Sequence, residues 1–211
     1  MNKIRNREGF SFIEIIIFVA IAAVLMLVVN SLKNNVSSIG GFVDQKLLSK
    51  QDVEQALQIM VTEIRSAGPS SLGAYPVESA TTSSFAFFSD INKDGIFEKV
   101  RYFLATNAGT STATSTIKKG VIIPTGNPLT YVTSTEIISK VINNVVVSTS
   151  SNLFDYFDSS ATSTAKMMTL PVNVQSIRIV RFNIYADLKP GSAPKPSFFS
   201  DVANIRNLRS N

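Results

Sequence analysis

One carboxylate, Glu14, interrupts an apolar stretch that reads GFSFIEIIIFVAIAAVLMLVV from Gly9 to Val29. A charged side chain inside a bilayer costs about 2.5–3.5 kcal/mol even on lenient insertion scales, so an acidic residue there indicates a function. An isolated carboxylate in apolar surroundings either becomes neutral or pairs with a cation. The chemistry expected of Glu14 is therefore neutralisation or pairing with a cation.

A second group of oxygen-bearing side chains lies in the run DINKDG. It occupies alternate positions of that run: Asp90, Asn92 and Asp94. This spacing is that of the first half of a calcium loop, in which Gly95 at the sixth position allows a sharp turn. The twelfth position of a full EF-hand loop is glutamate, but here it is Arg101, and Glu98 lies nearer and could substitute.

The same run also fits a β-hairpin turn. In that interpretation the Asp and Asn side chains bond their own backbone, and Gly95 adopts a positive φ. The flanking runs 85–88 and 99–104 would then pair as antiparallel strands. Both interpretations of the loop remain open at this point.

Residue types that usually carry catalysis are missing. The chain has no histidine and no cysteine, which removes the commonest general base, thiolate metal sites and disulfides. No nucleophile elbow, dinucleotide fingerprint or phosphate-binding GK[ST] loop occurs. Carboxylate pairs such as Asp155 and Asp158 have the character of loop charges. The sequence therefore predicts a protein that is not an enzyme and has no cofactor, with calcium at the DINKDG run as the one alternative.

The apolar run is long enough to cross a membrane as a helix. Residues 10–29 contain only Ser11 and Glu14 as polar residues, and about twenty helical residues span a bilayer core of ~30 Å. A secretory signal peptide would have a shorter apolar region and a small-residue cleavage site. Three basic residues precede the run: Lys3, Arg5 and Arg7. They predict a cytoplasmic N-terminus and an external C-terminal part.

The order of a short basic leader, Gly9, Phe10 and Glu14 resembles the type IV pilin family. The usual form of this segment is GFTLIE, and Ser11 and Phe12 replace the Thr and Leu with residues of similar polarity or size. The resemblance implies that a prepilin peptidase cleaves after Gly9 and that the new amine of Phe10 is N-methylated. It also implies that Glu14 pairs with the N-terminus of a neighbouring subunit.

Three further segments resemble the minor pilin W and minor pseudopilin J group. They are Ile59–Gly68, Phe88–Leu104, and Ala203–Asn207 followed by Leu208-Arg209. The absence of a C-terminal cysteine pair also favours a minor subunit. The resemblance implies a structural subunit of a type IV pilus or a type II secretion pseudopilus. The partners would be the prepilin peptidase, other major and minor subunits, and inner (cytoplasmic) membrane lipid before assembly.

These elements predict an α+β fold in which a long N-terminal helix packs on a C-terminal antiparallel β-sheet domain. The expected parts are a cleaved leader at 1–9, a transmembrane helix at 10–30, an amphipathic helix at 31–68 and an extracytoplasmic β-rich domain at 69–211. Gly40-Gly41 predicts a bend or a locally melted turn, and Gly68-Pro69 predicts the helix end. Six apolar residues fall on one face of the amphipathic helix: Val53, Leu57, Met60, Val61, Ile64 and Ala67.

Short β-prone runs alternate with Ser/Thr-rich connectors beyond residue 70. The candidate strands are 85–88, 99–104, 121–123, 136–142, 145–147 and 177–185. The apolar alternation of the last run changes phase, which predicts either a bulge near Val180 or burial on both faces. The tracts Thr110–Thr116 and Ser159–Thr164 are of low complexity and predict solvated loops.

Two other functions stay open. The net charge is +5, and removal of the leader, with its three basic residues and one acidic residue, leaves +3. A minor pilin of a DNA-uptake (competence) pilus would need phosphate contacts. The basic residues available are Lys118, Lys119, Arg178, Arg181, Lys189, Lys195, Arg206 and Arg209. Their scatter and the low charge argue against DNA as a partner. A plain single-pass anchored β-domain protein would explain the length of the apolar run but not Glu14.

Overall fold

The chain forms two compact units, Met1–Leu48 and Ser49–Asn211. The computed structural model describes residues 12–106, 114–146, 152–160, 166–187 and 196–208, without the side chains of 31–48 and 114. Helix α1 (Phe12–Arg65) begins in the first unit and ends in the second. The second unit also contains an antiparallel β-sheet, so the α+β class predicted from the sequence is confirmed.

Helix α1 has the charge distribution that its dipole favours. Glu14 lies in the first turn and Arg65 in the last turn. The helix ends three residues before the predicted stop at Gly68-Pro69. The backbone is helical through Gly40-Gly41, so the predicted melted turn is wrong there. The cost of about 1 kcal/mol per glycine relative to alanine does not interrupt a helix of this length.

The sheet is built from eight strands. They are β1 (Val77–Ala80), β2 (Ser84–Ser89), β3 (Glu98–Thr106), β4 (Thr114–Ile122), β5 (Ile137–Val146), β6 (Phe154–Phe157), β7 (Ile179–Ala186) and β8 (Ser197–Asn204). Their order is β1-β2-β3-β4-β5-β7-β6, with β8 also paired to β7. One residue pair, Val145 with Ala186, joins β5 to β7, so the sheet has a half made of β1–β5 and a half made of β6–β8. Three 3₁₀ turns complete the described elements: η1 (Thr133–Thr135), η2 (Val174–Ser176) and η3 (Arg206–Leu208).

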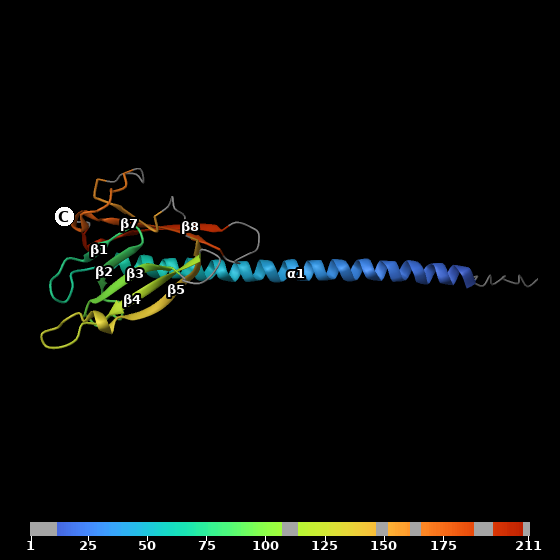
Figure 1. Cartoon of the computed structure of the whole chain (residues 1–211), viewed down its shortest axis with the longest axis horizontal. Coiled ribbons are helices and arrows are strands. Elements are labelled where there is room, and N and C mark those ends of the chain that lie inside the picture. Colours follow the sequence, from blue (N-terminus) through green and yellow to red (C-terminus); the bar gives the residue numbers. More distant parts are fainter. Residues whose placement is uncertain (1–11, 107–113, 147–151, 161–165, 188–195, 209–211) are drawn as a thin grey trace, which may run out of the picture. The chain divides into compact units, whose positions relative to one another are not determined.

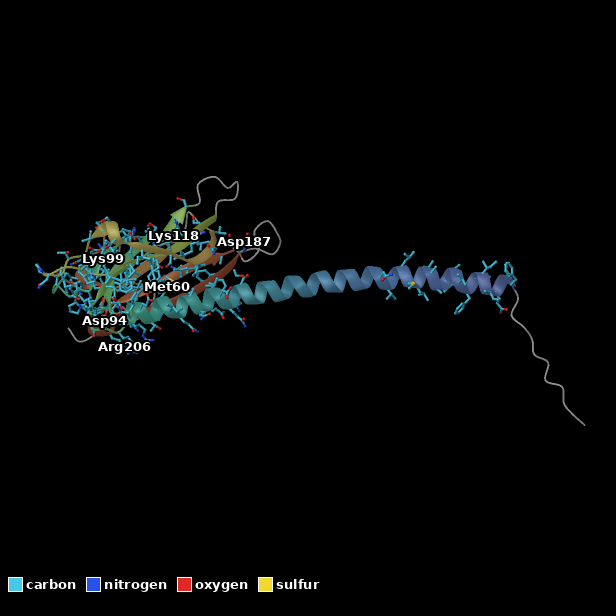
Figure 2. The ribbon with its side chains drawn as sticks, turned by 90° about the horizontal axis from the view of Figure 1, so that it is seen from below. Met60, Asp94, Lys99, Lys118, Asp187 and Arg206 are labelled. Atoms are coloured by element: carbon cyan, nitrogen blue, oxygen red, sulfur yellow. The ribbon has the colours of Figure 1, made fainter. Side chains whose placement is uncertain are left out.

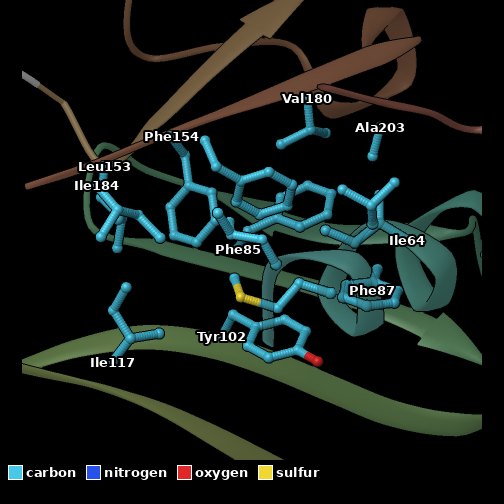
Figure 3. Close-up of a cluster of buried hydrophobic side chains, with 14 of the residues drawn as sticks. Ile64, Phe85, Phe87, Tyr102, Ile117, Leu153, Phe154, Val180, Ile184 and Ala203 are labelled. Carbon is cyan, nitrogen blue, oxygen red and sulfur yellow. The ribbon is translucent and has the colours of Figure 1, made fainter. Parts of the chain in front are cut away.

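The two halves of the sheet curl around the C-terminal end of α1, which Figure 1 shows in teal between β7–β8 and β3–β5. All six residues of the predicted apolar helix face are at most 8% exposed, which confirms that prediction. In Figure 3, Ile64 lies between Phe87 below and Ala203 above. Burial of each large apolar side chain contributes about 1.5–3 kcal/mol to this core.

Most predicted strands are present, with altered ends. The runs 85–88 and 99–104 lie in β2 and β3, and 121–123 overlaps the end of β4. The runs 136–142 and 145–147 belong to one strand, β5, whose pairing with β4 shifts register between Ser115 and Lys118. Residue 147 itself lies outside the described residues. Strands β1, β6 and β8 were not predicted.

Neither alternative for the run 177–185 is correct. Strand β7 pairs with β8 in continuous register from Ile179 to Ala186, without a bulge. Its buried and partly buried residues alternate along the whole strand. Ile177 lies before the strand, directly after η2, so the change of apolar phase marks where the strand begins.

The prediction of solvated loops is wrong for part of the first low-complexity tract and is confirmed for the described part of the second. Ser115 and Thr116 are 1% and 3% exposed within β4, so a solvated loop is wrong for them. Residues 110–113 of the same tract lie outside the described residues, and the loop stays a prediction there. Ser159 and Ser160 are exposed, as predicted, and 161–165 lie outside the described residues.

Candidate functional site

The described part of the N-terminal segment is a helix with an exposed apolar surface. Among the described residues, one segment, Phe12–Asn30, is long and apolar enough to cross a membrane. Its large apolar side chains from Phe12 to Val29 are 49–79% exposed. Glu14 is exposed on the same segment, in the first turn. The predicted cleavage residues Gly9 and Phe10 lie outside the described residues.

The DINKDG run forms the loop between β2 and β3, residues 90–97, as the hairpin interpretation predicts. Asp90 accepts hydrogen bonds from the backbone N–H groups of Asp94 (3.1 Å) and Gly95 (3.0 Å). Asn92 Oδ1 accepts from the N–H of Asp94 at 3.1 Å. Gly95 has a φ of +87°, and Lys93 has a φ of +62°. The predicted strand pairing is confirmed, because β2 and β3 are antiparallel neighbours in the sheet.

Glu98 faces this loop from the first position of β3. Its residue is 1% exposed, and its Oε2 accepts a hydrogen bond from the N–H of Ile91 at 3.0 Å. Its Oε1 is buried and has no hydrogen-bond partner among the described residues. Burial raises the pKa of the Glu98 carboxyl, and the charges of Asp94 and Asp90 raise it further, while the hydrogen bond from Ile91 lowers it.

Contacts that the sequence does not reveal hold the second arm of the loop. The N–H of Phe97 donates to Ser71 Oγ at 2.9 Å. The hydroxyl of Tyr131 donates to the carbonyl of Phe97 at 2.6 Å, and its ring lies 5.2 Å from that of Phe88. Ser71 and Tyr131 are 26 and 34 residues from Phe97, so no local pattern could have indicated these contacts.

The proposed calcium ligands are close in the chain but are not already gathered as a cluster. Within the described ranges, no three acidic side chains converge in the arrangement of a ready metal site. Asp94 instead accepts hydrogen bonds from the side-chain amide of Asn92 (2.8 Å) and the N–H of Ile96 (2.8 Å). A cation at this loop would therefore require the exposed side chains of Asn92 and Asp94 to turn toward Glu98.

The three segments that resemble the minor subunit group meet at the end of α1. The N–H of Gly68 donates to the carbonyl of Phe88 at 3.0 Å. The amide of Asn207 donates to the carbonyl of Ala67 at 2.8 Å. A Cβ on Gly68 would lie 2.6 Å from the ring of Phe97. One packed region thus contains residues from three segments that are separate in the sequence: Ile59–Gly68, Phe88–Leu104 and Ala203–Asn207.

A charged contact links the helix to β3 and β4. Glu63 accepts hydrogen bonds from the Tyr102 hydroxyl (2.7 Å) and the Lys119 ammonium (2.6 Å). Burial raises the pKa of Tyr102 far above its ordinary value, and the charge of Glu63 raises it further. The phenol therefore stays protonated and donates to the carboxylate.

Several basic residues considered for DNA contacts already bind other groups of the protein. Lys119 pairs with Glu63, and Arg181 pairs with Asp155 at 2.6 Å. Arg178 donates to the carbonyl of Gln175 at 2.6 Å. Lys189, Lys195 and Arg209 lie outside the described residues. The other two described residues of this set are Lys118, which is partly buried, and Arg206, which is exposed.

A polar hollow of about 400 Å³ lies elsewhere on the second unit, lined in part by Asp52, Asn144 and Asp187. Asp187 lies at the opposite end of this unit from Asp94 (Figure 2). The N–H of Asp187 donates to the carbonyl of Asn144 at 2.9 Å, which closes one wall. The hollow and the β2–β3 loop are therefore separate features.

No protein-family model, curated protein or solved structure matches this chain. The features that remain for a functional interpretation are the exposed apolar helix that carries Glu14 and the β2–β3 loop with its buried Glu98.

Proposed function

We propose that the chain is a structural minor subunit of a type IV pilus or a type II secretion pseudopilus. The observation that carries this proposal is the exposed apolar segment Phe12–Asn30 with a carboxylate, Glu14, in its first turn. A plain anchor needs the apolar length alone. The acidic residue makes sense when a second protein group supplies its counter-charge.

In this proposal the subunit is first a single-pass protein of the inner membrane. The basic residues of the leader keep the N-terminus in the cytoplasm, and the β-domain lies outside. A prepilin peptidase removes residues 1–9, and the new amine of Phe10 is N-methylated. The subunit then leaves the lipid and enters a fibre beside other major and minor subunits.

The role of Glu14 follows from the change of surroundings during assembly. The hydrocarbon tails of lipid carry no charge that could pair with a carboxylate, whereas the N-terminal amine of a neighbouring subunit does. Pairing of these two groups in apolar surroundings favours one axial register of helix against helix. The β-domain then adds contacts outside the membrane, and the subunit acts by binding and position instead of by catalysis.

A DNA-uptake pilus is a weaker alternative. Lys119, Arg178 and Arg181 would have to leave their present partners to contact phosphate. DNA binding would also fall steeply with salt, because each phosphate contact releases counterions. Retention of DNA that does not change with salt would therefore reject this alternative.

Mass spectrometry of the N-terminus from native membranes tests the main proposal. We expect the mature chain to begin at Phe10 with a methyl group on its amine. Replacement of Gly9 by a bulky residue such as leucine should leave the leader attached, because the peptidase recognises a small residue there. The control is Ser11→Thr, which restores the usual family residue and should be processed normally.

Two results would overturn the proposal. One is native protein that begins at an unmodified Met1. The other is normal removal of residues 1–9 from the Gly9→Leu variant. Crosslinking of the processed chain in native membranes, followed by identification of its partners, then distinguishes a pilus from a secretion system.

A further inference from the structure

The β2–β3 loop places negative charges near a buried carboxylate, and the proposed role in a filament does not explain this arrangement. Three carboxylates interact electrostatically there, although they are not gathered as a metal-binding cluster: Asp90, Asp94 and Glu98. Two of them lie in the loop, and the third is 1% exposed at the start of β3. Burial of an ionised carboxylate without a counter-charge or full hydrogen bonding is strongly unfavourable.

The basic residues nearest along β3 do not solve this problem. Lys99 pairs with Glu78 at 2.7 Å, and Arg101 forms a bidentate contact with Glu136. Arg101 is the residue at the twelfth position of the calcium pattern, and its positively charged guanidinium cannot be a calcium ligand. The buried Oε1 of Glu98 has no hydrogen-bond partner among the described residues, and a bound cation at this place would satisfy it.

We propose that the β2–β3 loop is a calcium site. Its side-chain ligands are Asp90, Asn92, Asp94 and Glu98. Counted from Asp90, these residues occupy the first, third, fifth and ninth positions, all of which face the ion in a calcium loop. Glu98 therefore acts at the ninth position and does not replace the missing glutamate at the twelfth. The seventh position, Ile96, would supply a backbone carbonyl.

The loop is already prepared for this role. The hydrogen bonds from Asp94 and Gly95 hold the Asp90 carboxylate at the start of the turn, and each of its oxygens retains lone pairs for a cation. Ser71 and Tyr131 fix the arm next to Glu98. Asn92 and Asp94 are exposed and can rotate toward the ion without disturbing the core.

Oxygen donors alone favour a hard cation. Calcium accepts six to eight oxygens in flexible geometry, whereas Mg²⁺ demands a near-ideal octahedron and keeps its water. A loop with one buried carboxylate and two exposed side chains therefore suits Ca²⁺ better than Mg²⁺. Without the twelfth glutamate, we expect a modest Kd of about 10⁻⁵–10⁻³ M.

The test uses the full chain in detergent, freed of metal with a chelator. Calorimetric titration with Ca²⁺ should give saturable heat, and Ca²⁺ at ten times Kd should raise the melting temperature by about 3–6 °C. Asp94→Asn and Glu98→Gln should each weaken Ca²⁺ binding at least about tenfold, because each removes a charged ligand. Glu54→Gln, which changes an exposed glutamate on α1, should bind like the unaltered chain.

The melting temperatures of Glu98→Gln and the unaltered chain, compared in chelator and in Ca²⁺, distinguish a metal site from a glutamate that is merely protonated. In chelator, Glu98→Gln should melt at a higher temperature than the unaltered chain, because it removes a buried repelling charge. In saturating Ca²⁺ the order should reverse. Asp94→Asn changes an exposed residue, so it tests the ligand role even where Glu98→Gln fails to fold.

Three results would each overturn the proposal. The first is no Ca²⁺ heat together with an unchanged melting temperature in chelator. The second is equal loss of binding in Glu54→Gln and Asp94→Asn. The third is equal affinity for Mg²⁺ and Ca²⁺, which would remove the assignment to calcium.

Discussion

Gly120 lies at a point of β4 where a side chain would collide with a charged pair. A Cβ at this position would overlap the Glu136 carboxylate, with the Cδ atom at 2.7 Å. Glu136 is held there because both of its oxygens accept hydrogen bonds from Arg101, at 2.8 and 3.0 Å. A side chain at position 120 would therefore displace the Glu136 carboxylate from the place where it pairs with Arg101.

Gly120→Ala should destabilise the protein by about 1–3 kcal/mol, because the new methyl group displaces Glu136 from Arg101. Chemical unfolding followed by circular dichroism measures this change. The matched control is the same substitution in a Glu136→Ala background, where the obstacle is gone and the cost should fall. An equal cost in both backgrounds would contradict the explanation.

Local residue chemistry could be predicted from the sequence, whereas contacts between distant residues could not. The bonding of Asp90 to the backbone of its own loop follows from Asx-turn chemistry over a few residues. The Glu63–Lys119 pair joins residues 56 positions apart, and no short pattern encodes it. Burial of Glu98 was equally hidden, because its run reads as an exposed turn.

At the scale of elements, the sequence pattern predicts the C-terminal end of α1 most clearly. Its apolar residues recur with the helical period over several turns, and each of the six lies in the core. Two isoleucines of this segment differ sharply: Ile64 is 0% exposed and Ile59 is 49% exposed. They provide a matched pair within one helix.

Ile64→Ala should lower the free energy of unfolding by about 2–5 kcal/mol, because it leaves a cavity between the helix and both halves of the sheet. Ile59→Ala removes the same atoms from the surface and should cost less than about 1 kcal/mol. Urea unfolding of the two variants compares them directly. Similar losses would show that the helix does not pack through the Ile64 face.

The strands were harder to predict because polar residues interrupt their patterns. Strand β6 reads FDYF, and the carboxylate of its buried Asp155 accepts hydrogen bonds from Arg181 and Asn183 of β7 and from Asn152. Strand β8 has polar residues between Phe199 and Ala203, and its partner in the described sheet is β7, the strand before it in the chain. Arg181 lies 26 residues from Asp155, so no local pattern of β6 indicates this contact.

At the scale of the whole molecule, composition predicts an apolar N-terminal segment and a β-rich remainder. The two compact units divide between Leu48 and Ser49, so the last part of α1 belongs to the same unit as the sheet. The order of strands could not be predicted. Strand β6 follows β5 in the chain, yet β7 lies between them in the sheet. This order depends on which surfaces bury each other, and no local propensity specifies it.

Glu14→Val should leave membrane insertion and leader cleavage intact, because it makes the segment more apolar. Entry into the fibre should fall strongly, since the counter-charge for the neighbouring N-terminus is lost. The measurement is the share of the chain in sheared fibres relative to the membrane fraction. Glu14→Asp keeps the charge and should retain more of this share, and undiminished entry of Glu14→Val would contradict the pairing mechanism.

The last described residues of the chain contact the end of α1, and these contacts affect when the domain can fold during synthesis. Strand β8, Ile205 and Leu208 cover the same core as Ile64 and Ala67, and Asn207 donates to the carbonyl of Ala67 just beyond the helix end. A nascent chain that has not yet released these residues leaves that surface open to water. The β-domain therefore reaches its closed form only after translation has passed Leu208.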